Sequence, residues 1–335
     1  MWFNVILTSG GNLLTVIAFL RDRNIYSKPA NLLILNLAFA DLKVGLVSLP
    51  LFNLWWHYGD WIFGEYVCKW WVIVDYTATL ESMIAILLIS WDRLWMVRNI
   101  QSYVQNQTRQ KVVVIILISW ILTYSYYIVT VLLLEPITGK RNIDYTSDCD
   151  FPPNYYLSFT IFEVMTQFTI PVLALSYFNL GVFYVIRKRA KVGQVNETSA
   201  VGLSATADTL QAVPITPASG NDRLTDIPTN DDDMNARSQR DEDSTSVPKV
   251  PKHSLRKDRK AAITLTLLVV TYILCWAPYN VVIILETLSE DIVSKPVASF
   301  TEYLLWMNSG INPFLYVATN TQFRNQLKTM FSYGR

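Results

Sequence analysis

The sequence has little charge, cysteine or histidine. Only 16% of its 335 residues are charged, with 28 Lys and Arg against 27 Asp and Glu. A net charge of +1 provides no basic face for a polyanion, so we expect no nucleic-acid partner. Three cysteines are too few for a disulfide framework. With two histidines outside the apolar blocks, and no HExxH, GxSxG or phosphate-binding loop, the chain is not expected to be an enzyme.

Long apolar blocks are abundant instead. Hydrophobic residues make up 51% of the chain, and the mean hydropathy is +0.25. Blocks of about 20 residues or more can cross a hydrocarbon core of about 30 Å. They predict an all-α membrane protein, a bundle of seven transmembrane helices followed by a short amphipathic helix. The spans are expected at residues 2–20, 30–56, 67–91, 112–134, 155–186, 261–288 and 297–319.

Composition divides the chain into four segments. Residues 1–192 contain spans one to five, and residues 255–319 contain spans six and seven. Residues 193–254 are rich in Ser, Thr, Pro, Asp and Asn and nearly free of aromatics, which predicts a disordered third cytoplasmic loop. Residues 320–335 are a short tail whose apolar spacing predicts an interfacial helix at residues 321–331.

Basic residues gather in one set of loops. Arg21, Arg23 and Lys28 follow the first span, and similar groups follow the third and fifth spans and precede the sixth. Because short cytoplasmic loops carry the excess of Lys and Arg, we expect the N-terminus outside and the C-terminus in the cytoplasm. The basic ends of spans five and six either anchor these helices or dock a cytoplasmic partner.

The three cysteines allow three pairings. Cys68 and Cys149 fall in the loops expected outside, where the compartment is oxidising, whereas Cys275 lies within a span. We therefore expect a disulfide between Cys68 and Cys149.

Ionisable residues inside spans are costly and usually mark function. Asp75 follows Cys68 by seven residues, about 10 Å along a helix, and shares one face with Thr79, Ser82 and Arg93. It is either paired with a neighbouring helix or the counter-ion of a cationic amine, and we favour the second interpretation. The aromatic residues expected around it are Tyr76, Trp276, Tyr279, Tyr303 and Trp306.

Two further acids lie in the spans near this region. Glu163 stands four residues before Gln167 in span five, and is either a second ligand contact or a carboxylate that reaches water or a loop. Glu81 is off the polar face of span three, and we expect it to pair with the neighbouring helix.

Asp41 stands near the middle of span two, where an unpaired carboxylate would be costly. Oxygen ligands without thiols or imidazoles suit a sodium ion with water, and the alternative is a hydrogen-bond network alone. No other metal or cofactor is expected. The residues that could converge on Asp41 are Asn12, Ser82, Asn308, Ser309 and Asn312.

Prolines interrupt four of the spans. Each removes a helical hydrogen bond and favours a kink, so the bundle could have two packings. They are Pro50, Pro171, Pro278 and Pro313.

Several short motifs occur along the chain, namely Gly11-Asn12, 35–41, Trp61, Cys68 with Asp75, Asp92-Arg93-Leu94, Trp120, Pro171, 275–278 and 312–316. Taken together, they resemble the rhodopsin-like (class A) G-protein-coupled receptors. The position of Asp75 between Cys68 and Asp92 is similar to that in the aminergic subfamily, and the surrounding stretches most resemble type 3 and type 4 histamine receptors, followed by muscarinic receptors.

The resemblance implies a plasma-membrane receptor that binds a protonated biogenic amine through Asp75. It implies coupling to heterotrimeric G proteins, of the inhibitory Gi/Go class for these histamine subtypes, with arrestin, receptor kinases and membrane lipid as further partners. The expected ligand-binding residues are Asp75, Tyr76, Thr79, Glu163, Gln167, Trp276, Tyr279, Asn280, Tyr303 and Trp306. The expected G-protein switch comprises Asp92, Arg93, Pro278, Pro313 and Tyr316.

Two departures from the family pattern leave alternatives open. Leu94 replaces the Tyr of the Asp-Arg-Tyr motif, which allows altered coupling or basal activity. Gln167 stands where the histamine subtypes hold Glu, and the nearby acid is Glu163. Histamine, a larger amine and acetylcholine all stay open as ligands, and the alternative function is an orphan or weakly signalling receptor of the same fold.

Overall fold

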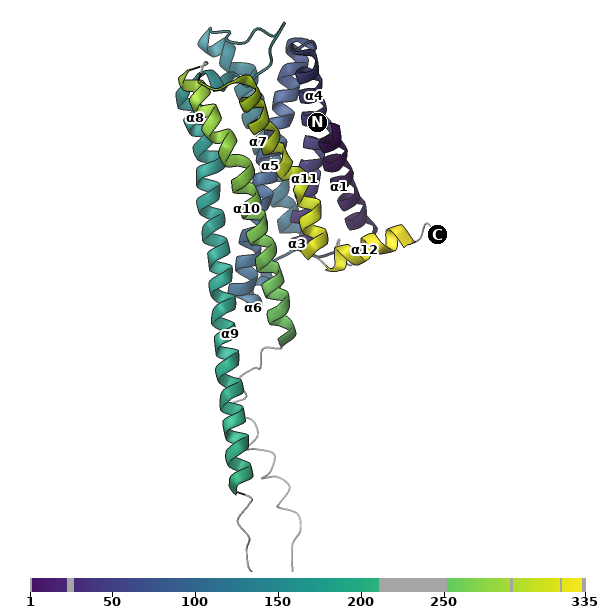
Figure 1. Cartoon of the computed structure of the whole chain (residues 1–335), viewed down its shortest axis with the longest axis vertical. Helices are drawn as coiled ribbons and strands as arrows, with labels where there is room; N and C mark the ends of the chain where they lie inside the picture. The colour runs from purple at the N-terminus through teal and green to yellow at the C-terminus, as the bar shows by residue number, and fades with distance from the viewer. Residues whose placement is uncertain (1, 23–26, 211–251, 290–291, 320, 333–335) are drawn as a thin grey trace, which may run out of the picture. The chain divides into compact units, whose positions relative to one another are not determined.

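The computed structural model describes residues 2–22, 27–210, 252–289, 292–319 and 321–332, and these residues are largely helical with no strand (Figure 1). The all-α prediction is confirmed. Two units are distinguished, one of Met1–Val185 with Arg259–Arg335 and one of Ile186–Asp258. Helix extends to Leu210 and resumes at Lys252. The rest of the loop predicted at 193–254 lies outside the described residues, so its disorder stays a prediction.

Long helices follow the apolar blocks. They are α1 (Trp2–Arg21), α3 (Pro29–Lys43), α4 (Leu49–Tyr58), α5 (Gly64–Arg98), α7 (Arg109–Thr138), α8 (Leu157–Val164), α9 (Ile170–Leu210), α10 (Lys252–Leu288) and α11 (Lys295–Thr319). A π-helical turn, η1 (Val44–Ser48), joins α3 to α4, and a second, η3 (Met165–Thr169), joins α8 to α9. Shorter elements are α6 (Ile100–Asn106), the 3-10 turn η2 (Pro152–Tyr155) and α12 (Thr321–Ser332).

Six spans in the described residues are long and apolar enough to cross a membrane. The seventh predicted span, α11, is 25 residues long but less apolar, since it carries Lys295, Glu302, Asn308 and Asn312. Asn308 and Asn312 are buried, and Asn312 donates to Asp41 of α3, so part of what lowers the hydropathy of α11 lies in the interior of the bundle.

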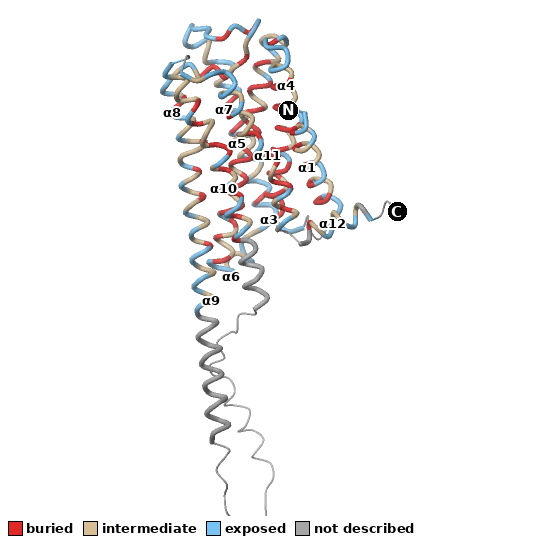
Figure 2. The backbone as a smooth tube through the Cα atoms, in the orientation of Figure 1, coloured by how far each residue is buried: buried red, intermediate tan, exposed pale blue. Residues whose placement is uncertain are grey.

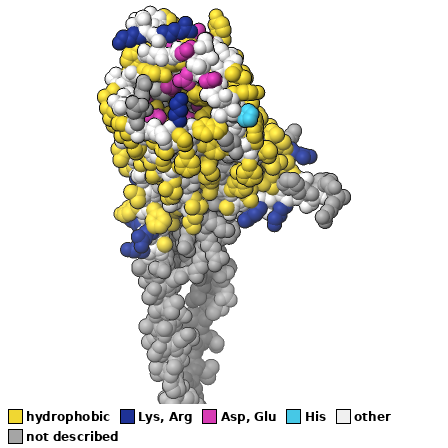
Figure 3. Space-filling view, turned by 45° about the horizontal axis from the view of Figure 1, so that its top comes forward, with side chains coloured by type: hydrophobic (Ala, Val, Ile, Leu, Met, Phe, Trp, Pro, Cys, Tyr) yellow, Lys and Arg dark blue, Asp and Glu magenta, His cyan; other side chains and the backbone are white. Residues whose placement is uncertain are grey.

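Helix α5 lies at the centre of the bundle. It packs against α3 and α7, while α1 packs against α3 and α11. In Figure 2 the buried residues recur along the helices of this unit, and Figure 3 shows a broad hydrophobic surface around its sides. Leu117, Ile121 and Leu122 of α7, for example, are exposed, as expected of a surface that contacts lipid.

Helix α12 turns away from the end of α11 (Figure 1). Phe323 anchors it, because this side chain is buried and its ring lies 5.7 Å from that of Phe19 in α1. Lys328, on the same short helix, is exposed. The amphipathic helix predicted after the last span is thus present.

Proline leaves helix carbonyls without their usual donors, and side chains of other helices supply replacements. Pro171 cannot donate to the carbonyl four residues earlier, on Gln167, and the Tyr272 hydroxyl of α10 donates to that oxygen instead. Pro313 likewise frees the carbonyl of Ser309, which accepts from Asn12 Nδ2 of α1 at 3.0 Å. At Pro171 and Pro313, contacts between helices therefore replace the hydrogen bonds that proline removes.

One intramembrane charge was missed by the sequence analysis. Lys43 Nζ donates to the Tyr124 hydroxyl at 2.8 Å and lies 3.9 Å from the centre of the Trp120 ring. Nearby, the Glu81 carboxylate accepts from Ser119 and Thr123 of α7, both at 3.0 Å, which confirms that it pairs with the neighbouring helix. A lysine inside an apolar span, two residues after Asp41, was the signal that could have revealed this cluster.

We predict that Tyr272→Phe lowers the stability of the bundle by about 1–3 kcal/mol, because it leaves the Gln167 carbonyl buried and unpaired. The measurement is the melting temperature of the purified protein in detergent. Tyr184→Phe removes the same hydroxyl from an exposed side chain and is the matched control. Equal melting temperatures for Tyr272→Phe and the control would contradict this account of the kink.

Candidate functional site

A cavity of about 650 Å³ opens at one end of the bundle. Its walls come from α4 and the two residues after it, from α5, α10, α11 and the loop that contains Cys149, with one residue, Gln167, from η3. We call this end of the unit the disulfide end. The volume falls in the range of pockets that bind small organic ligands.

The disulfide fixes the loop over the cavity. Cys68 at the start of α5 is bonded to Cys149, with their Cα atoms 5.6 Å apart, so the predicted pairing is confirmed. Trp61 N donates to Ser147 O at 2.8 Å and ties the same loop to the segment after α4. Just beyond Cys149, the Phe151 ring is fully buried 4.3 Å from the ring of Tyr76.

Asp75 is the central anion of the cavity. Its side chain is buried, with 8% exposure, and Oδ1 accepts a hydrogen bond from Trp306 Nε1 at 3.0 Å. Trp306 is itself positioned by an edge contact with Phe52, at 4.6 Å between ring centres. No basic side chain forms an ion pair with Asp75 among the described residues. A neutral donor therefore holds this carboxylate while its charge stays uncompensated.

Aromatic side chains line the cavity beside Asp75. Tyr76 and Tyr279 interact through their hydroxyls, and Trp276 lies deeper, 4.9 Å from the ring of Tyr272. Trp276 is only 3% exposed, and its indole N–H has no hydrogen-bond partner. The Thr79 hydroxyl in the same wall is also unpaired. Buried polar groups are normally hydrogen-bonded, so these atoms are available to a ligand.

The structure brings seven of the ten expected ligand-binding residues together and leaves three outside the cavity wall. The residues that line it are Asp75, Tyr76, Thr79, Gln167, Trp276, Tyr279 and Trp306. Asn280 donates to the Trp276 carbonyl at 2.8 Å. Tyr303 interacts with Asn4 of α1.

Glu163 is the third residue outside the wall. Its Oε1 accepts from the Tyr126 hydroxyl of α7 at 2.7 Å. The sequence analysis placed it on one face with Gln167 because residues four apart align in an α-helix. The π turn η3 begins at Met165 between them and has a wider i→i+5 repeat, which changes that alignment. Gln167 keeps its place in the wall and donates from Nε2 to the Tyr127 hydroxyl at 2.9 Å.

A second polar cluster surrounds Asp41 deeper in the bundle. Asp41 is fully buried, with Oδ1 accepting from Ser82 at 2.8 Å and Oδ2 accepting from Asn312 at 2.7 Å. Asn12 is linked to this cluster because its side-chain amide donates to the carbonyl of Ser309. The side-chain oxygens without a hydrogen-bond partner are those of Asn12, Asn308 and Asn312. A carboxylate with unpaired amide oxygens nearby fits a hard cation such as sodium.

At the opposite end from the disulfide, Asp92 contacts α6 and not Arg93. Its carboxylate accepts from the Tyr103 hydroxyl at 3.1 Å and from Gln107 Nε2 at 2.5 Å. Within the described chain Arg93 forms no ion pair with it, and Nη1 lies 3.9 Å from the Met96 sulfur. Tyr103 and Gln107 were not expected as partners, because α6, which carries Tyr103 and ends just before Gln107, was not predicted.

The unusual Leu94 packs against α9. Its side chain is buried, and a Cβ atom added to Gly181 would lie only 2.8 Å from Leu94 Cδ1. A side chain at residue 181 would therefore require Leu94 to change its side-chain conformation. Of the other expected switch residues, Pro278 and Pro313 lie inside α10 and α11, and Tyr316 is buried with an unpaired hydroxyl.

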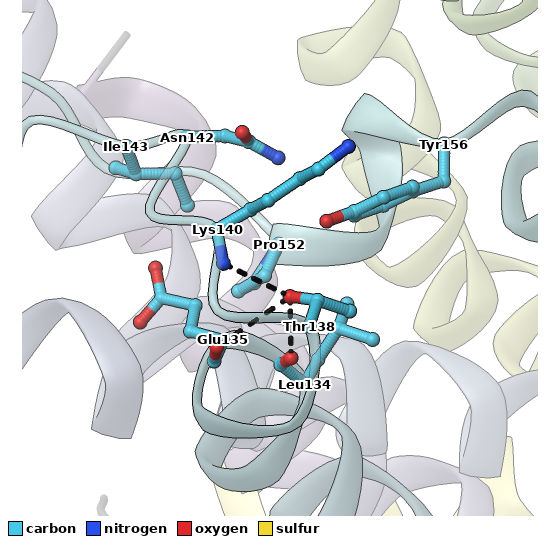
Figure 4. A pocket seen from close by; sticks show the side chains of 8 residues that line it. All are labelled: Leu134, Glu135, Thr138, Lys140, Asn142, Ile143, Pro152 and Tyr156. Atoms are coloured by element: carbon cyan, nitrogen blue, oxygen red, sulfur yellow. Dashed lines mark hydrogen bonds between the residues drawn. The ribbon is translucent and has the colours of Figure 1, made fainter.

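A small hollow lies beside the end of α7. Figure 4 shows Thr138 at its base, with its hydroxyl donating to the Leu134 carbonyl at 2.8 Å and accepting from the Lys140 amide at 3.4 Å. The surrounding side chains leave no space for a water molecule. It is not a ligand site.

Comparisons with known proteins agree with this architecture. The family model for the 7 transmembrane receptor (rhodopsin family) matches residues 11–316. The histamine H4 receptor of Mus musculus is 28% identical, covering 94% of this chain and 86% of that receptor. The 5-hydroxytryptamine receptor 1E of Homo sapiens is 26% identical, covering 97% and 89%.

These matches confirm the predicted resemblance to class A aminergic receptors. The family model spans most of the chain, including the helices that line the cavity and the Asp41 cluster. Its members are multi-pass membrane receptors and not enzymes. The chain belongs to the rhodopsin family of seven-transmembrane receptors.

Proposed function

We propose that this chain is a G-protein-coupled receptor for a small cationic amine, with Asp75 as the counter-ion of the ammonium group. The observation that carries the proposal is the buried Asp75 carboxylate, which faces a cavity of about 650 Å³ and has a neutral hydrogen-bond donor, Trp306. A buried charge is costly unless it is paired. A bound ammonium supplies the missing pair.

The walls suit the rest of such a ligand. The rings of Tyr76, Trp276, Tyr279 and Trp306 line the cavity and could add cation–π contacts of about 0.5–2 kcal/mol each. Near η3 the wall offers the amide of Gln167 and the hydroxyl of Thr79, both neutral. With Glu163 bonded to Tyr126, the far end of the amine meets neutral hydrogen-bonding groups in this part of the cavity.

The similarity to these receptors supports an amine as the ligand but does not identify which amine binds. Their names refer to histamine and 5-hydroxytryptamine, each an amine with a polar aromatic ring. The identities of 28% and 26% leave the specific amine open, including an acetylcholine-like ligand. We therefore assign the class of amine and not one compound.

Signalling would pass from this cavity to the opposite end of the bundle. We place the disulfide end outside the cell and the C-terminus in the cytoplasm, as the loop charges indicate. An amine that binds two helix packings with different affinity shifts their populations. The Tyr272 ring joins the cavity floor at Trp276 to the kink of α8–α9, so this contact can transmit the shift. The partner is a heterotrimeric G protein of the inhibitory class.

The Asp41 cluster is proposed to hold a sodium ion that favours the resting packing. Its supports are the full burial of Asp41 and the unpaired oxygens of Asn308 and Asn312. Sodium and an activating amine would then oppose each other, and this coupling is reciprocal.

The first test is Asp75→Asn in cells that express the chain with each major class of G protein. We expect amine binding to weaken by about 2–5 kcal/mol, because the ammonium loses a desolvated partner. Surface expression and second-messenger signals are measured together over a panel of biogenic amines and acetylcholine.

Glu163→Gln, which removes an acid outside the cavity wall, is the matched control. If affinity is retained in the Asp75 variant, the counter-ion assignment is wrong, and silence of the wild type across the panel favours the orphan alternative.

The second test replaces sodium by N-methyl-D-glucamine at constant ionic strength. In the wild type, we expect sodium to lower the affinity of the activating amine, and Asp41→Asn to abolish that difference. Asp144→Asn, which removes an exposed loop carboxylate, should keep it. An amine affinity that does not respond to sodium in the wild type would contradict the site.

A further inference from the structure

Lys43 places an ammonium group at mid-depth in the membrane. The span Pro29–Tyr58 is 30 residues long, and Lys43 lies 14 residues after its first residue and 15 before its last. At a rise of about 1.5 Å per residue, the Lys43 backbone is about 21–23 Å from either end of the span. The hydrocarbon core extends only about 15 Å on each side of its middle, so Lys43 lies in its most apolar part. A charge at this depth is costly and usually marks function.

The Lys43 side chain opens on the outer surface of the bundle. Phe39, one turn before Lys43 on the same face of α3, is exposed, and Lys43 itself is half-buried. On α7, Ile121 directly follows Trp120 and is also exposed. Asp41, only two residues before Lys43, is fully buried by contrast. The ammonium group therefore lies where the bundle contacts lipid.

Three aromatic rings surround this ammonium group. Nζ lies 3.9 Å from the centre of the Trp120 ring, 4.9 Å from that of Tyr124 and 5.3 Å from that of Phe39. Trp120 is fixed in turn, because its Nε1 donates to Asn36 Oδ1 at 2.8 Å. The Tyr124 hydroxyl is the acceptor for one N–H group of Lys43 in the described structure, and an ammonium has three such donors. The rings hold the cation in place and leave it able to donate further.

No carboxylate forms an ion pair with Lys43 in the part of the chain that the structure describes. Glu81 of α5 is the acid whose charge interacts with that of Lys43. Its two oxygens accept instead from the hydroxyls of Ser119 and Thr123, both at 3.0 Å. Because Glu81 is fully buried while Lys43 opens on the surface, the outer side of the ammonium group has no anion.

Depth decides which anion can reach the outer side of Lys43. The charged groups of lipids lie at the interface, about 15 Å from the middle of the hydrocarbon core. A second copy of the chain brings acids that are buried in its own bundle at this depth, such as Asp41 and Glu81. A transmembrane helix of another protein can present an acidic side chain at mid-depth, where ionisable groups pair with one another.

We infer that the surface of α3 and α7 around Lys43 is a docking site for a transmembrane helix that carries an Asp or Glu residue at mid-depth. The carboxylate of that helix accepts from the N–H groups of Lys43 that Tyr124 leaves free. Phe39 and Ile121 offer exposed apolar surface to the rest of the helix. The site lies outside the cavity wall, so the inference goes beyond the proposed function and is independent of which amine binds.

The test uses the full chain in phosphatidylcholine vesicles with three synthetic transmembrane peptides of Leu and Ala. One peptide has Glu at its centre, one has Gln there, and one has Glu displaced toward an end by two turns. Association is measured by energy transfer between a label on the receptor and a label on the peptide. We expect the central-Glu peptide to bind about tenfold more tightly than either of the others, because an ion pair forms in a medium of low dielectric constant.

Two lysine variants assign the preference to its residue. Lys43→Met should bring the three affinities together, since Met keeps the length of the side chain and loses its charge. Lys140→Met, which removes an exposed lysine from the loop after α7, is the matched control and should keep the preference. Melting curves establish that both variants are folded.

Equal affinities for the three peptides in the wild type would overturn the site without any variant. A preference for central Glu that survives Lys43→Met would overturn the assignment to Lys43. Loss of the preference when phosphatidylglycerol replaces part of the lipid would indicate an anionic lipid on this surface. Energy transfer between two labelled receptors that is lost in Lys43→Met would indicate a second copy there, and either result would overturn the helix partner.

Discussion

The bundle depends on one constraint, that backbone polar groups inside a membrane need partners within the protein. Proline breaks the helical pattern that normally supplies them. In this chain the two affected carbonyls with known replacements are those of Gln167 and Ser309, which accept from Tyr272 and Asn12. Each of these two replacements comes from another helix, so these two proline sites also join helices.

The same constraint connects the cavity with the rest of the bundle. Gln167 contributes its side chain to the cavity wall and its carbonyl to the contact with Tyr272. The Tyr272 ring in turn packs against Trp276 in the wall. A ligand that moves either wall residue therefore acts on a hydrogen bond between α10 and η3. Two contacts, Trp276 with Tyr272 and Tyr272 with the Gln167 carbonyl, therefore connect the cavity wall to the packing of α10 against η3.

Much of this architecture was predictable because membranes impose strong patterns. Apolar blocks indicated the helices, and compartment chemistry selected Cys68 and Cys149 over the buried Cys275. The cost of burying charge drew attention to Asp75 and Asp41, whose surroundings the structure now describes. These predictions required only the type of residue and its depth along a helix.

Other features depended on details that sequence spacing does not contain. The π turn at Met165–Thr169 altered the face of Glu163, which an ideal α-helix would have aligned with Gln167. The partners of Asp92 come from α6, a loop helix without a strong apolar pattern. Acids of the cavity wall come from separate segments, Glu286 from α10, Glu302 from α11 and Asp150 from the loop after Cys149, so their proximity emerges only on folding.

The disulfide determines the stage of biosynthesis at which the loop over the cavity is fixed. Asp150 directly follows Cys149, and the bridge attaches this part of the loop to α5, the helix that carries Asp75. A newly made chain whose thiols are still reduced can assemble its helices without fixing that loop. The bridge fixes this part of the cavity mouth only after oxidation, so the cavity takes its final shape in an oxidising compartment.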